Sequence, residues 1–377
     1  MRLMLIHPWA GLPSRQSLYI GLEEVTGWDL MIVTARRWKD DYGRIVRATP
    51  DPKLRGRLLA LPVGLSGNIP LHFFMSGLKR HIREFNPDCI YIYHEPYAVG
   101  TYQMIRAAKS VTSIPVGIRS AQNIVKRYPT PFRQWERQVY RQSDFAVVVS
   151  ENVAQVMREK GYQRPIRVVP MPVDTATFFP AADAQSESAP LRLGFVGRLV
   201  PEKGIDTALK ALASLPPGAA DLTIIGDGPQ RSALVELATS LGVSDAVCWR
   251  GSLDLQATAD AYRAFDVVLV PSRATDRWRE QFGRVVIEAA ATGVPVIATR
   301  SGELPFLVDS IGAGWIVEEE DAGTMAAILE TLRADRGSLV DIGHRLRKVA
   351  EEKYSDRTIV DQLVDTFTEA VAIHRST

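Results

Sequence analysis

The sequence predicts an α/β protein built from two doubly wound domains, each with a parallel sheet. Its 377 residues correspond to two domains at roughly 150 residues each. Short apolar runs without polar alternation are typical of strands covered on both faces. They alternate with longer amphipathic stretches, and such β–α alternation implies parallel sheets with right-handed crossovers. A stretch rich in Pro, Ala, Ser and Asp at 170–190 interrupts this rhythm and has the composition of a linker.

In the first half, the expected strands are short runs of aliphatic and aromatic residues. They are Leu3–His7, Leu30–Thr34, Cys89–Tyr93, Pro115–Ile118 and Phe145–Ser150. Helical patterns lie between several of them, for example over Leu71–Glu84 and Thr101–Ser110. The amphipathic stretch Asp356–His374 predicts a C-terminal helix.

The second half repeats this organisation. Its expected strands are Arg192–Val196, Asp221–Ile225, Ala246–Trp249, Val267–Val270 and Pro295–Ala298, and its expected helices include Gly204–Ala213, Pro229–Leu241 and Gly283–Thr292. The domain boundaries follow: an N-terminal domain over 1–170, a linker over 171–190, a C-terminal domain over 191–355 and a last helix over 356–377. We expect this last helix to pack back on the N-terminal domain.

Composition excludes several protein classes. No apolar run reaches eighteen residues, so we expect no transmembrane helix. The opening segment, MRLMLIHPWAGLPS, predicts a buried first strand, because a secretory signal needs a longer apolar core. Cys89 and Cys248 are isolated in apolar stretches, so they form no disulfide framework or metal site. We expect both to be core residues of a cytoplasmic protein.

Charge is divided unequally along the chain. Residues 1–170 contain 25 Lys and Arg against 13 Asp and Glu, whereas the other residues contain 20 against 30. This imbalance indicates an anionic partner for the first half. Its basic residues cluster at Arg36–Lys39, Lys53–Arg57, Lys79–Arg83 and Arg133–Arg141. We expect an anionic membrane surface; a solvated basic face or a soluble anionic acceptor is the alternative, and nucleic acid is disfavoured because no nucleic-acid-reading motif accompanies the charge.

Two glycine-containing turns follow expected strands of the second half. In GFVGRLVPEKG, Gly197 permits a sharp turn, while Arg198 and Lys203 offer cationic donors suited to a diphosphate. In IGDGP, Gly226 and Gly228 keep a second turn open beside a ligand. Because ligands bind beyond the carboxyl ends of parallel strands, both turns are candidate ligand sites. Each turn alone is equally consistent with a plain strand–helix connection.

The strongest motif is EQFGRVVIEAAATGVPVIA, over 280–298. Glu280 lies in a loop after an expected strand, and Glu288 lies among apolar neighbours on the helix that begins near Phe282 and Gly283. Amides at a helix start bind phosphate or sugar oxygens. A carboxylate accepts bidentate bonds from vicinal hydroxyls, so two fixed carboxylates suit a sugar and a ribose. The alternative for Glu288 is a structural pair with an arginine across the sheet, or exposure.

Together these segments resemble the retaining glycosyltransferases of family 4, which have the GT-B fold of two Rossmann-like domains facing across a cleft. The matching residues are Gly197, Arg198, Glu202, Lys203, Gly204, Gly226, Gly228, Glu280, Phe282, Gly283 and Glu288. The segment 169–180 resembles the interdomain link of that family, although Met171 and Pro172 replace its usual Asn-Gly. The resemblance covers nearly the whole chain in layout and is specific over about 169–298.

The resemblance implies a role for each matching residue. Arg198 and Lys203 would bind the donor diphosphate, Glu288 the ribose, and Glu280 the donor sugar near its reacting carbon, which makes Arg198, Lys203 and Glu280 the catalytic candidates. The amides of Phe282, Gly283 and Arg284 would contact the sugar or phosphate, and the nucleotide base would lie near Leu253. In the acceptor domain, the loop after the first strand would be represented by Gly11.

One departure from the family pattern concerns the acceptor domain. Many members have a histidine at the end of a strand facing the donor sugar, but here Pro115–Ile118 is followed by Arg119, Ser120, Ala121, Gln122 and Asn123. Gln122 or Asn123 could supply the polar contact, and Arg119 could meet the sugar or an acceptor phosphate. His94 and Glu95 are further candidates on the acceptor side.

The resemblance implies a retaining, hexose-type glycosyltransferase that uses a nucleotide-diphosphate sugar. We expect a glycan acceptor, lipid-linked, in cell-surface polysaccharide or glycolipid synthesis at the inner face of the membrane. No aspartate cluster is spaced to hold Mg²⁺, so we expect no metal and no other cofactor. A nicotinamide dehydrogenase would need a G-x-G-x-x-G turn where His7–Ser14 has one glycine. The alternative is a catalytically silent nucleotide-sugar-binding or scaffold protein of the same fold.

Overall fold

The computed structural model describes residues 1–40, 43–181, 190–276, 278–312 and 314–376. The chain divides into two compact units: unit 1 comprises Met1–Pro170 and Asp356–Thr377, and unit 2 comprises Met171–Ser355. Part of the expected linker, 182–189, lies outside the described residues. No helix in the described part of the chain is both long and apolar enough to cross a membrane.

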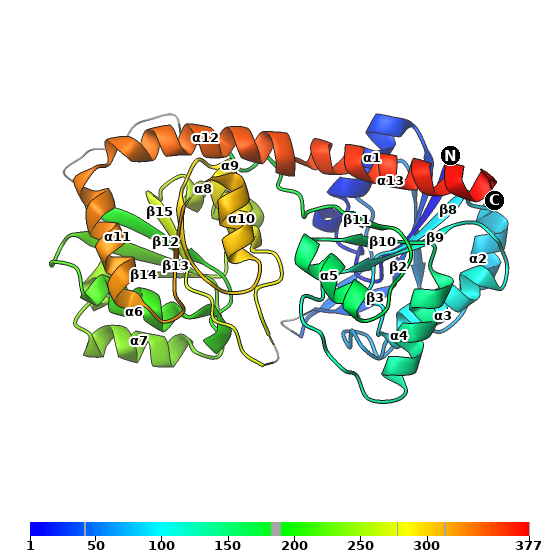
Figure 1. Ribbon diagram of the computed structural model, residues 1–377, viewed down its shortest axis with the longest axis horizontal. Coiled ribbons are helices and arrows are strands. Elements are labelled where there is room, and N and C mark those ends of the chain that lie inside the picture. The colour runs from blue at the N-terminus through cyan, green and yellow to red at the C-terminus, as the bar shows by residue number, and fades with distance from the viewer. Residues whose placement is uncertain (41–42, 182–189, 277, 313, 377) are drawn as a thin grey trace. The chain divides into compact units, whose positions relative to one another are not determined.

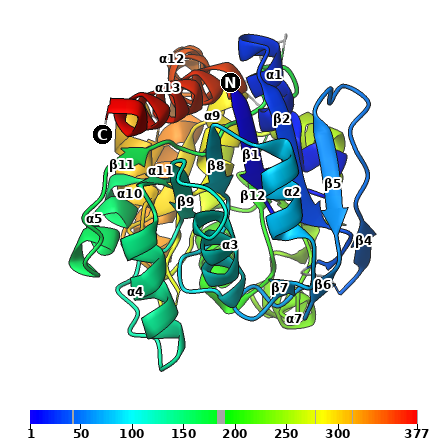
Figure 2. The ribbon, with the colours of Figure 1, turned by 90° about the vertical axis from the view of Figure 1, so that its right-hand side faces the viewer.

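Unit 1 contains a seven-stranded sheet in the order β11-β10-β9-β8-β1-β2-β5, in which every neighbouring pair is parallel. Its strands are β1 (Arg2–Ile6), β2 (Asp29–Ala35), β5 (Arg57–Leu61), β8 (Cys89–Ile92), β9 (Val116–Ser120), β10 (Phe145–Val148) and β11 (Ile166–Val168). Helices α1 (Ser17–Thr26) and α13 (Asp356–Ser376) cover one face. Helices α2 (Leu78–Phe85), α3 (Val99–Lys109) and α4 (Phe132–Gln142) cover the other (Figures 1 and 2), and α5 (Glu151–Glu159) precedes β11.

The last helix is part of the core of unit 1. Ile359, Leu363 and Phe367 of α13 are buried with Tyr19 and Leu22 of α1. Gly21 allows this close approach, because a Cβ there would lie 2.9 Å from a methyl group of Val360. The amphipathic period of this helix therefore matches the apolar face that it buries.

Unit 2 contains a six-stranded parallel sheet in the order β14-β13-β12-β15-β16-β17. Its strands are β12 (Leu191–Val196), β13 (Ala220–Ile225), β14 (Val247–Gly251), β15 (Val267–Val270), β16 (Val296–Thr299) and β17 (Gly314–Val317). The helices are α6 (Ile205–Ala213), α7 (Arg231–Ser240), α8 (Leu255–Tyr262), α9 (Arg284–Ala291), α10 (Leu304–Ile311), α11 (Ala322–Ala334) and α12 (Gly337–Tyr354). Leu209 and Leu212 of α6 share a buried core with Met325 and Leu329 of α11.

The structure corrects the expected helix over Leu71–Glu84. Helix α2 begins only at Leu78, after Gly77, whose φ of +89° lies in the left-handed region. The preceding residues form a two-stranded hairpin of β6 (Val63–Gly64) and β7 (Phe73–Phe74). A second hairpin pairs β3 (Arg37–Lys39) with β4 (Ile45–Arg47). The apolar residues before Gly77 therefore follow a strand period rather than a helical one.

Two further expectations differ from the structure. Cys89 is buried, but Cys248 is exposed because it lies on β14, the edge strand of its sheet. Residues 171–180 do not run as an open linker but pack on unit 2. Phe178 is buried with its ring 5.7 Å from that of Tyr262, and Arg347 donates hydrogen bonds to the backbone carbonyls of Thr175 and Phe178.

Both sheets reverse their strand order once. In unit 2 the chain builds outward from β12 to β14 and then returns to place β15 on the other side of β12. In unit 1, β1 and β8 flank the equivalent point. Connections that leave such a pair in opposite directions open a crevice at the carboxyl ends of the strands, where ligands of open α/β sheets bind. Each unit therefore has one location at which a site is expected.

Candidate donor and acceptor sites

The donor-side residues predicted from the sequence all follow strands of unit 2 or begin the helix after β15. Gly197, Arg198 and Lys203 follow β12; Gly226 and Gly228 follow β13; Leu253 follows β14; Glu280, Phe282 and Gly283 follow β15, with Arg284 and Glu288 on α9. Because these strands are parallel neighbours, their carboxyl ends share one edge of the sheet. The fold thus brings four separate stretches of sequence to the switch point of unit 2.

Glycines allow the loops after β12 and β13 to touch. Gly226 has a φ of +134°, and a Cβ there would lie 1.8 Å from the carbonyl oxygen of Gly197. A Cβ on Gly228 would lie 2.4 Å from the carbonyl oxygen of Leu199. Gly197 itself has room for a Cβ, with its nearest neighbour the Phe195 ring at 3.4 Å. The sequence predicted that the first turn needs a glycine at Gly197. The structure instead requires glycine in the second turn, at Gly226 and Gly228.

Lys203 and Glu280 meet although 77 residues separate them. The Lys203 ammonium donates to Glu280 Oε2 at 2.5 Å, and Ser272 Oγ donates to the same oxygen at 3.2 Å. The ammonium also lies 5.1 Å from the Trp278 ring centroid, within range of a cation–π interaction. Both side chains are largely buried, at 24% and 13% exposed. The two residues assigned to diphosphate and sugar thus form one ion pair.

The main chain of Glu280 is held by a loop that sequence reasoning missed. Glu303 N–H donates to the Glu280 carbonyl oxygen at 3.0 Å. Gly302, with a φ of +57°, permits this contact, because a Cβ there would lie 2.2 Å from the same oxygen. Ser301 and Gly302 come one residue after the end of β16, so a small residue and a glycine shortly after a strand were the available signal. Gly302 and Glu303 are therefore positioning residues for Glu280.

Glu288 is a buried carboxylate with two partners. Tyr262 Oη donates to Glu288 Oε2 at 3.1 Å, and Arg284 forms an ion pair with Glu288 across one helical turn at 3.1 Å. Burial raises the pKa of Glu288, while Arg284 and Tyr262 act in the opposite direction. The structure has neither of the alternatives, since Glu288 is buried and its arginine partner lies on the same helix and is itself 56% exposed. A ligand hydroxyl could replace the exposed arginine.

The other donor-side residues surround this core. Arg198 is exposed on the loop after β12, and Leu253 is half-buried after β14. Phe282 is buried, and Gly283 precedes α9 with a φ of +84°. Gly283 has no side chain to cap α9, so within the described residues the amides at the start of this helix are left for a phosphate or sugar oxygen. In the described part of the chain, no group of three His, Cys, Asp or Glu side chains could hold a metal ion.

In unit 1, two of the acceptor-side candidates, Gly11 and Glu95, form hydrogen bonds that hold their own loops in place. Gly11, after β1, accepts a hydrogen bond from Thr49 N–H at 2.9 Å, and buried Gln16 ties this loop to the same segment. Glu95, after β8, accepts from Ser120 Oγ at 2.9 Å and from Ala121 N–H at 2.8 Å. These contacts fix the loops themselves. Burial raises the pKa of Glu95.

The remaining acceptor candidates lie on and after β9. Arg119 packs its guanidinium 4.2 Å from the centroid of the Tyr93 ring. Gln122 donates to Tyr128 Oη at 3.1 Å, and Asn123 is buried. Of these residues, the half-buried Arg119 lies beside a group of aromatic side chains, most of which the sequence did not single out.

That group is a cluster of histidine and tryptophan at the switch point of unit 1. His7 and Trp9 follow β1, His94 follows β8, Trp38 lies on β3, and His72 precedes β7. Ring centroids are 5.1 Å apart for Trp9 and His94, 4.6 Å for His72 and His94, and 5.7 Å for Trp9 and Trp38. His94 was already a candidate, and the His-Pro-Trp sequence after the first strand was a signal for His7 and Trp9.

The histidines of this cluster are neutral, and their bonding fixes two tautomers. Burial lowers the pKa of His7, His72 and His94. His72 Nδ1 lies 3.2 Å from the Ile69 carbonyl oxygen, and His94 Nδ1 lies 2.6 Å from Thr101 Oγ1, which itself donates to the Glu95 carbonyl. Both Nδ1 atoms must therefore carry the proton. The Nε2 atoms of all three rings are buried and lack a hydrogen-bond partner within the described residues.

Two family models match consecutive parts of the chain. The model "Glycosyltransferase Family 4" matches 20–177, and "Glycosyl transferases group 1" matches 181–352. The chain belongs to the family 4 glycosyltransferases. A D-inositol 3-phosphate glycosyltransferase of Salinispora arenicola is 34% identical over 264 residues, covering 63% of this chain and 58% of its own. That of Corynebacterium jeikeium is 34% identical over 238 residues, covering 58% and 55%. The chain thus spans less than two thirds of these relatives' lengths.

Solved structures with the same fold span the whole chain. Sucrose-phosphate synthase from Thermosynechococcus elongatus has a TM-score of 0.75 at 21% identity, covering 99% of this chain and 100% of its own. HepE of Anabaena, solved in complex with UDP, has a TM-score of 0.76 at 17% identity, covering 98% and 100%. These similarities confirm the expected GT-B fold of two Rossmann-like domains for this chain.

Proposed function

We propose that the protein transfers a hexose-type sugar from a nucleotide-diphosphate donor to a glycan, with retention of anomeric configuration. The observation that carries this proposal is the meeting of Lys203, Glu280 and the start of α9 at the switch point of unit 2. HepE, a structural neighbour, was solved with UDP and with UDP-glucose, which supports a nucleotide-sugar donor.

The chemistry follows from where charge develops. As the sugar–phosphate bond breaks, negative charge grows on the leaving diphosphate, and preorganised donors that stabilise it accelerate the reaction. Arg198, Lys203 and the first amides of α9 are those donors in this proposal. Glu280 then holds Lys203 in place and contacts the donor sugar. Because cations and amides of the chain stabilise the leaving group, the reaction proceeds without a metal ion.

The test is to incubate the protein with a panel of nucleotide sugars and to measure nucleoside-diphosphate release, with and without a chelator. Slow hydrolysis of one donor, unaffected by the chelator, is the expected result and would identify the sugar. A protein that binds nucleoside diphosphate but releases none from any donor would instead be a silent nucleotide-sugar-binding protein. Loss of release on chelation would overturn the metal-independent mechanism.

We propose that the acceptor binds unit 1 beside the histidine–tryptophan cluster. Trp9 and Trp38 are partly exposed, and aromatic faces with a few convergent polar groups are typical of small-molecule sites. The acceptor in this proposal is a lipid-linked glycan, used in cell-surface polysaccharide or glycolipid synthesis at the inner face of the membrane. The names of the curated relatives favour a second candidate, a phosphorylated polyol. Transfer assays with inositol 3-phosphate and with lipid extracts distinguish the two.

A further inference from the structure

The hairpin of β6 and β7 has apolar side chains on its outward side. Along 71–75, burial alternates: His72 and Phe74 are buried, whereas Leu71, Phe73 and Met75 are 37%, 37% and 64% exposed. The turn of the hairpin adds Leu65 at 58% and Ile69 at 38%. We call Leu65, Ile69, Leu71, Phe73 and Met75 the apolar strip.

Such a strip is unusual on a surface that faces only water. A sheet with one solvated side normally alternates apolar residues with polar ones, and clustered exposed apolar residues mark interaction sites. Phe73 is held outward by the fold, because its ring lies against Gly64, where a Cβ would be 2.5 Å from Phe73 Cζ. The apolar strip is therefore an ordered feature of the hairpin.

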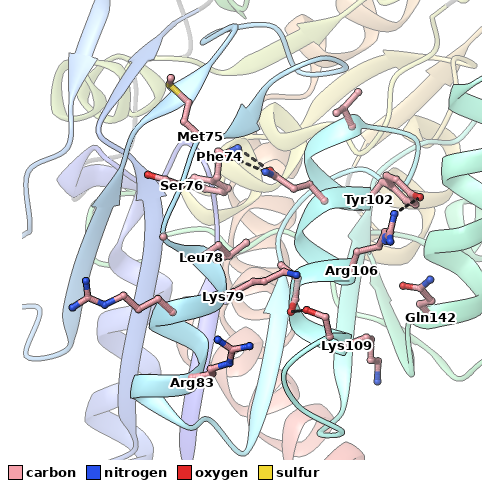
Figure 3. Close-up of a pocket in the computed structure, with 16 residues that line it drawn as sticks. Phe74, Met75, Ser76, Leu78, Lys79, Arg83, Tyr102, Arg106, Lys109 and Gln142 are labelled. Carbon is pink, nitrogen blue, oxygen red and sulfur yellow. Dashed lines mark hydrogen bonds between the residues drawn. The ribbon is translucent and has the colours of Figure 1, made fainter.

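A basic groove adjoins the apolar strip at Met75, which belongs to both. It has a volume of about 870 Å³ and runs between α2 and α3, with Met75 in its lining (Figure 3). Five cations line it, namely Lys79, Arg80, Arg83, Arg106 and Lys109, and its lining includes no acidic side chain. Figure 3 shows Lys79 and Arg83 of α2 lying across from Arg106 and Lys109 of α3. The groove is thus suited to an anion.

Three of these cations are available to a ligand. Arg80 pairs with Glu84 at 2.6 Å and Lys109 with Asp144 at 2.6 Å. Within the part of the chain that the structure describes, Lys79, Arg83 and Arg106 have no carboxylate partner. Leu78, Ile82 and Phe85 anchor α2 in the core, so its basic face is turned outward. Unpaired cations in an open groove favour phosphate groups.

We propose that the apolar strip and the basic groove together dock the protein on an anionic phospholipid surface. The strip enters the boundary between headgroups and acyl chains, while Lys79, Arg83 and Arg106 bind headgroup phosphates. Adjacent apolar and basic side chains are the combination that binds membrane interfaces, because burial and charge attraction then act together. This inference rests on the proposed function for its purpose: a protein docked on the membrane could reach the lipid-linked acceptor proposed above.

The test is co-sedimentation with phosphatidylcholine vesicles containing rising fractions of phosphatidylglycerol, using the full chain. Neutralising both groove cations in Lys79→Ser/Arg83→Ser should lower vesicle affinity roughly 30-fold and flatten its dependence on salt. Phe73→Ser/Met75→Ser should lower affinity at every salt concentration. The matched controls are Arg345→Ser/Lys348→Ser and Phe306→Ser, which remove exposed residues of unit 2 and should leave binding unchanged.

Wild-type protein that remains in the supernatant with anionic vesicles at low salt would overturn the proposal. So would equal losses in the control and test variants, which would indicate nonspecific charge attraction. Thermal unfolding checks that each variant is folded, and all substituted residues are exposed. Nucleoside-diphosphate release from a soluble donor should be the same in all these variants, so failure of docking and failure of the proposed reaction are measured separately.

Discussion

The switch points of the two units differ in kind although their sheets are built alike. In unit 2 the crevice loops carry exposed or half-buried charges held by glycine turns, with Lys203 and Glu280 paired at 2.5 Å. In unit 1 the equivalent loops carry neutral histidines packed against tryptophan, with unpartnered Nε2 atoms. The same topology therefore presents charged side chains at one switch point and aromatic rings at the other.

The unit with the candidate diphosphate site has a net negative charge, and the other unit has a net positive charge. Unit 1 has 27 basic and 17 acidic residues, whereas unit 2 has 18 and 26. The candidate diphosphate site thus lies in the acidic unit, where two or three placed cations decide binding. The excess positive charge of unit 1 is the observation behind the proposal that an anionic membrane surface is its partner.

The largest expected effect concerns the cation of the donor crevice. Lys203→Ala should lower turnover by about 10²-fold or more, as when one preorganised donor to a developing anion is removed. Lys210→Ala, which removes a half-exposed lysine of α6, is the matched control and should change turnover little. Normal turnover in both Lys203→Ala and Arg198→Ala would exclude them from leaving-group stabilisation.

The glycine contact between the donor loops gives the second prediction. Gly226→Ala should destabilise unit 2 by about 2 kcal/mol or more, because the added Cβ would meet the Gly197 carbonyl in a strained backbone conformation. Gly197→Ala is the control, since its Cβ has ordinary contacts. Denaturant unfolding measures both; equal stability of the two variants would show that the loops do not need this contact.

The two glutamates separate binding from catalysis. Glu280→Gln should depress turnover, because in the proposed function Glu280 contacts the donor sugar near its reacting carbon. Glu288→Gln should weaken nucleoside-diphosphate binding by about tenfold, the cost of one charge-assisted hydrogen bond. Calorimetry and steady-state kinetics measure the two effects. If nucleoside diphosphate bound Glu288→Gln as tightly as wild type, Glu288 would not hold the ribose.

A unit 1 variant sharpens the comparison. Trp9→Ala should lower transfer to acceptor roughly tenfold through loss of an aromatic face, while slow donor hydrolysis continues at the wild-type rate. Donor hydrolysis reports on unit 2, and transfer requires both units. A parallel loss of hydrolysis would mean that Trp9 supports the fold or the donor site instead.

The smallest effect is a pH dependence of stability in unit 1. Burial lowers the pKa of His7, His72 and His94, so the unfolded chain binds protons more readily than the folded one. Stability should therefore fall as pH drops below about 6.5, the pKa of an unfolded histidine. His72→Gln removes one of these titrating groups. The slope of the free energy of unfolding against pH should therefore decrease by the equivalent of at most one bound proton. Unfolding at several pH values measures the slope, and an unchanged slope would place the titration elsewhere.

Several features could be predicted from particular residues alone. Val267–Val270 and the other apolar runs predicted the central strands, because a strand buried on both faces needs an uninterrupted run of apolar side chains. The stretch containing Glu280 and Glu288 was the strongest indication of the family. It could be recognised in the sequence because its residues lie close together in the chain. The amphipathic period after Asp356 predicted the last helix.

Tertiary structure decided what depends on residues distant in sequence. The contact of Gly302 with Glu280, the meeting of His7, His72 and His94, and the exposure of Phe73 and Met75 are such features. The error over Leu71–Glu84 has the same origin, because its short apolar part before Gly77 suits either period until its partners are known. Local sequence determines which faces are apolar, but only the packed chain determines which of those faces is covered.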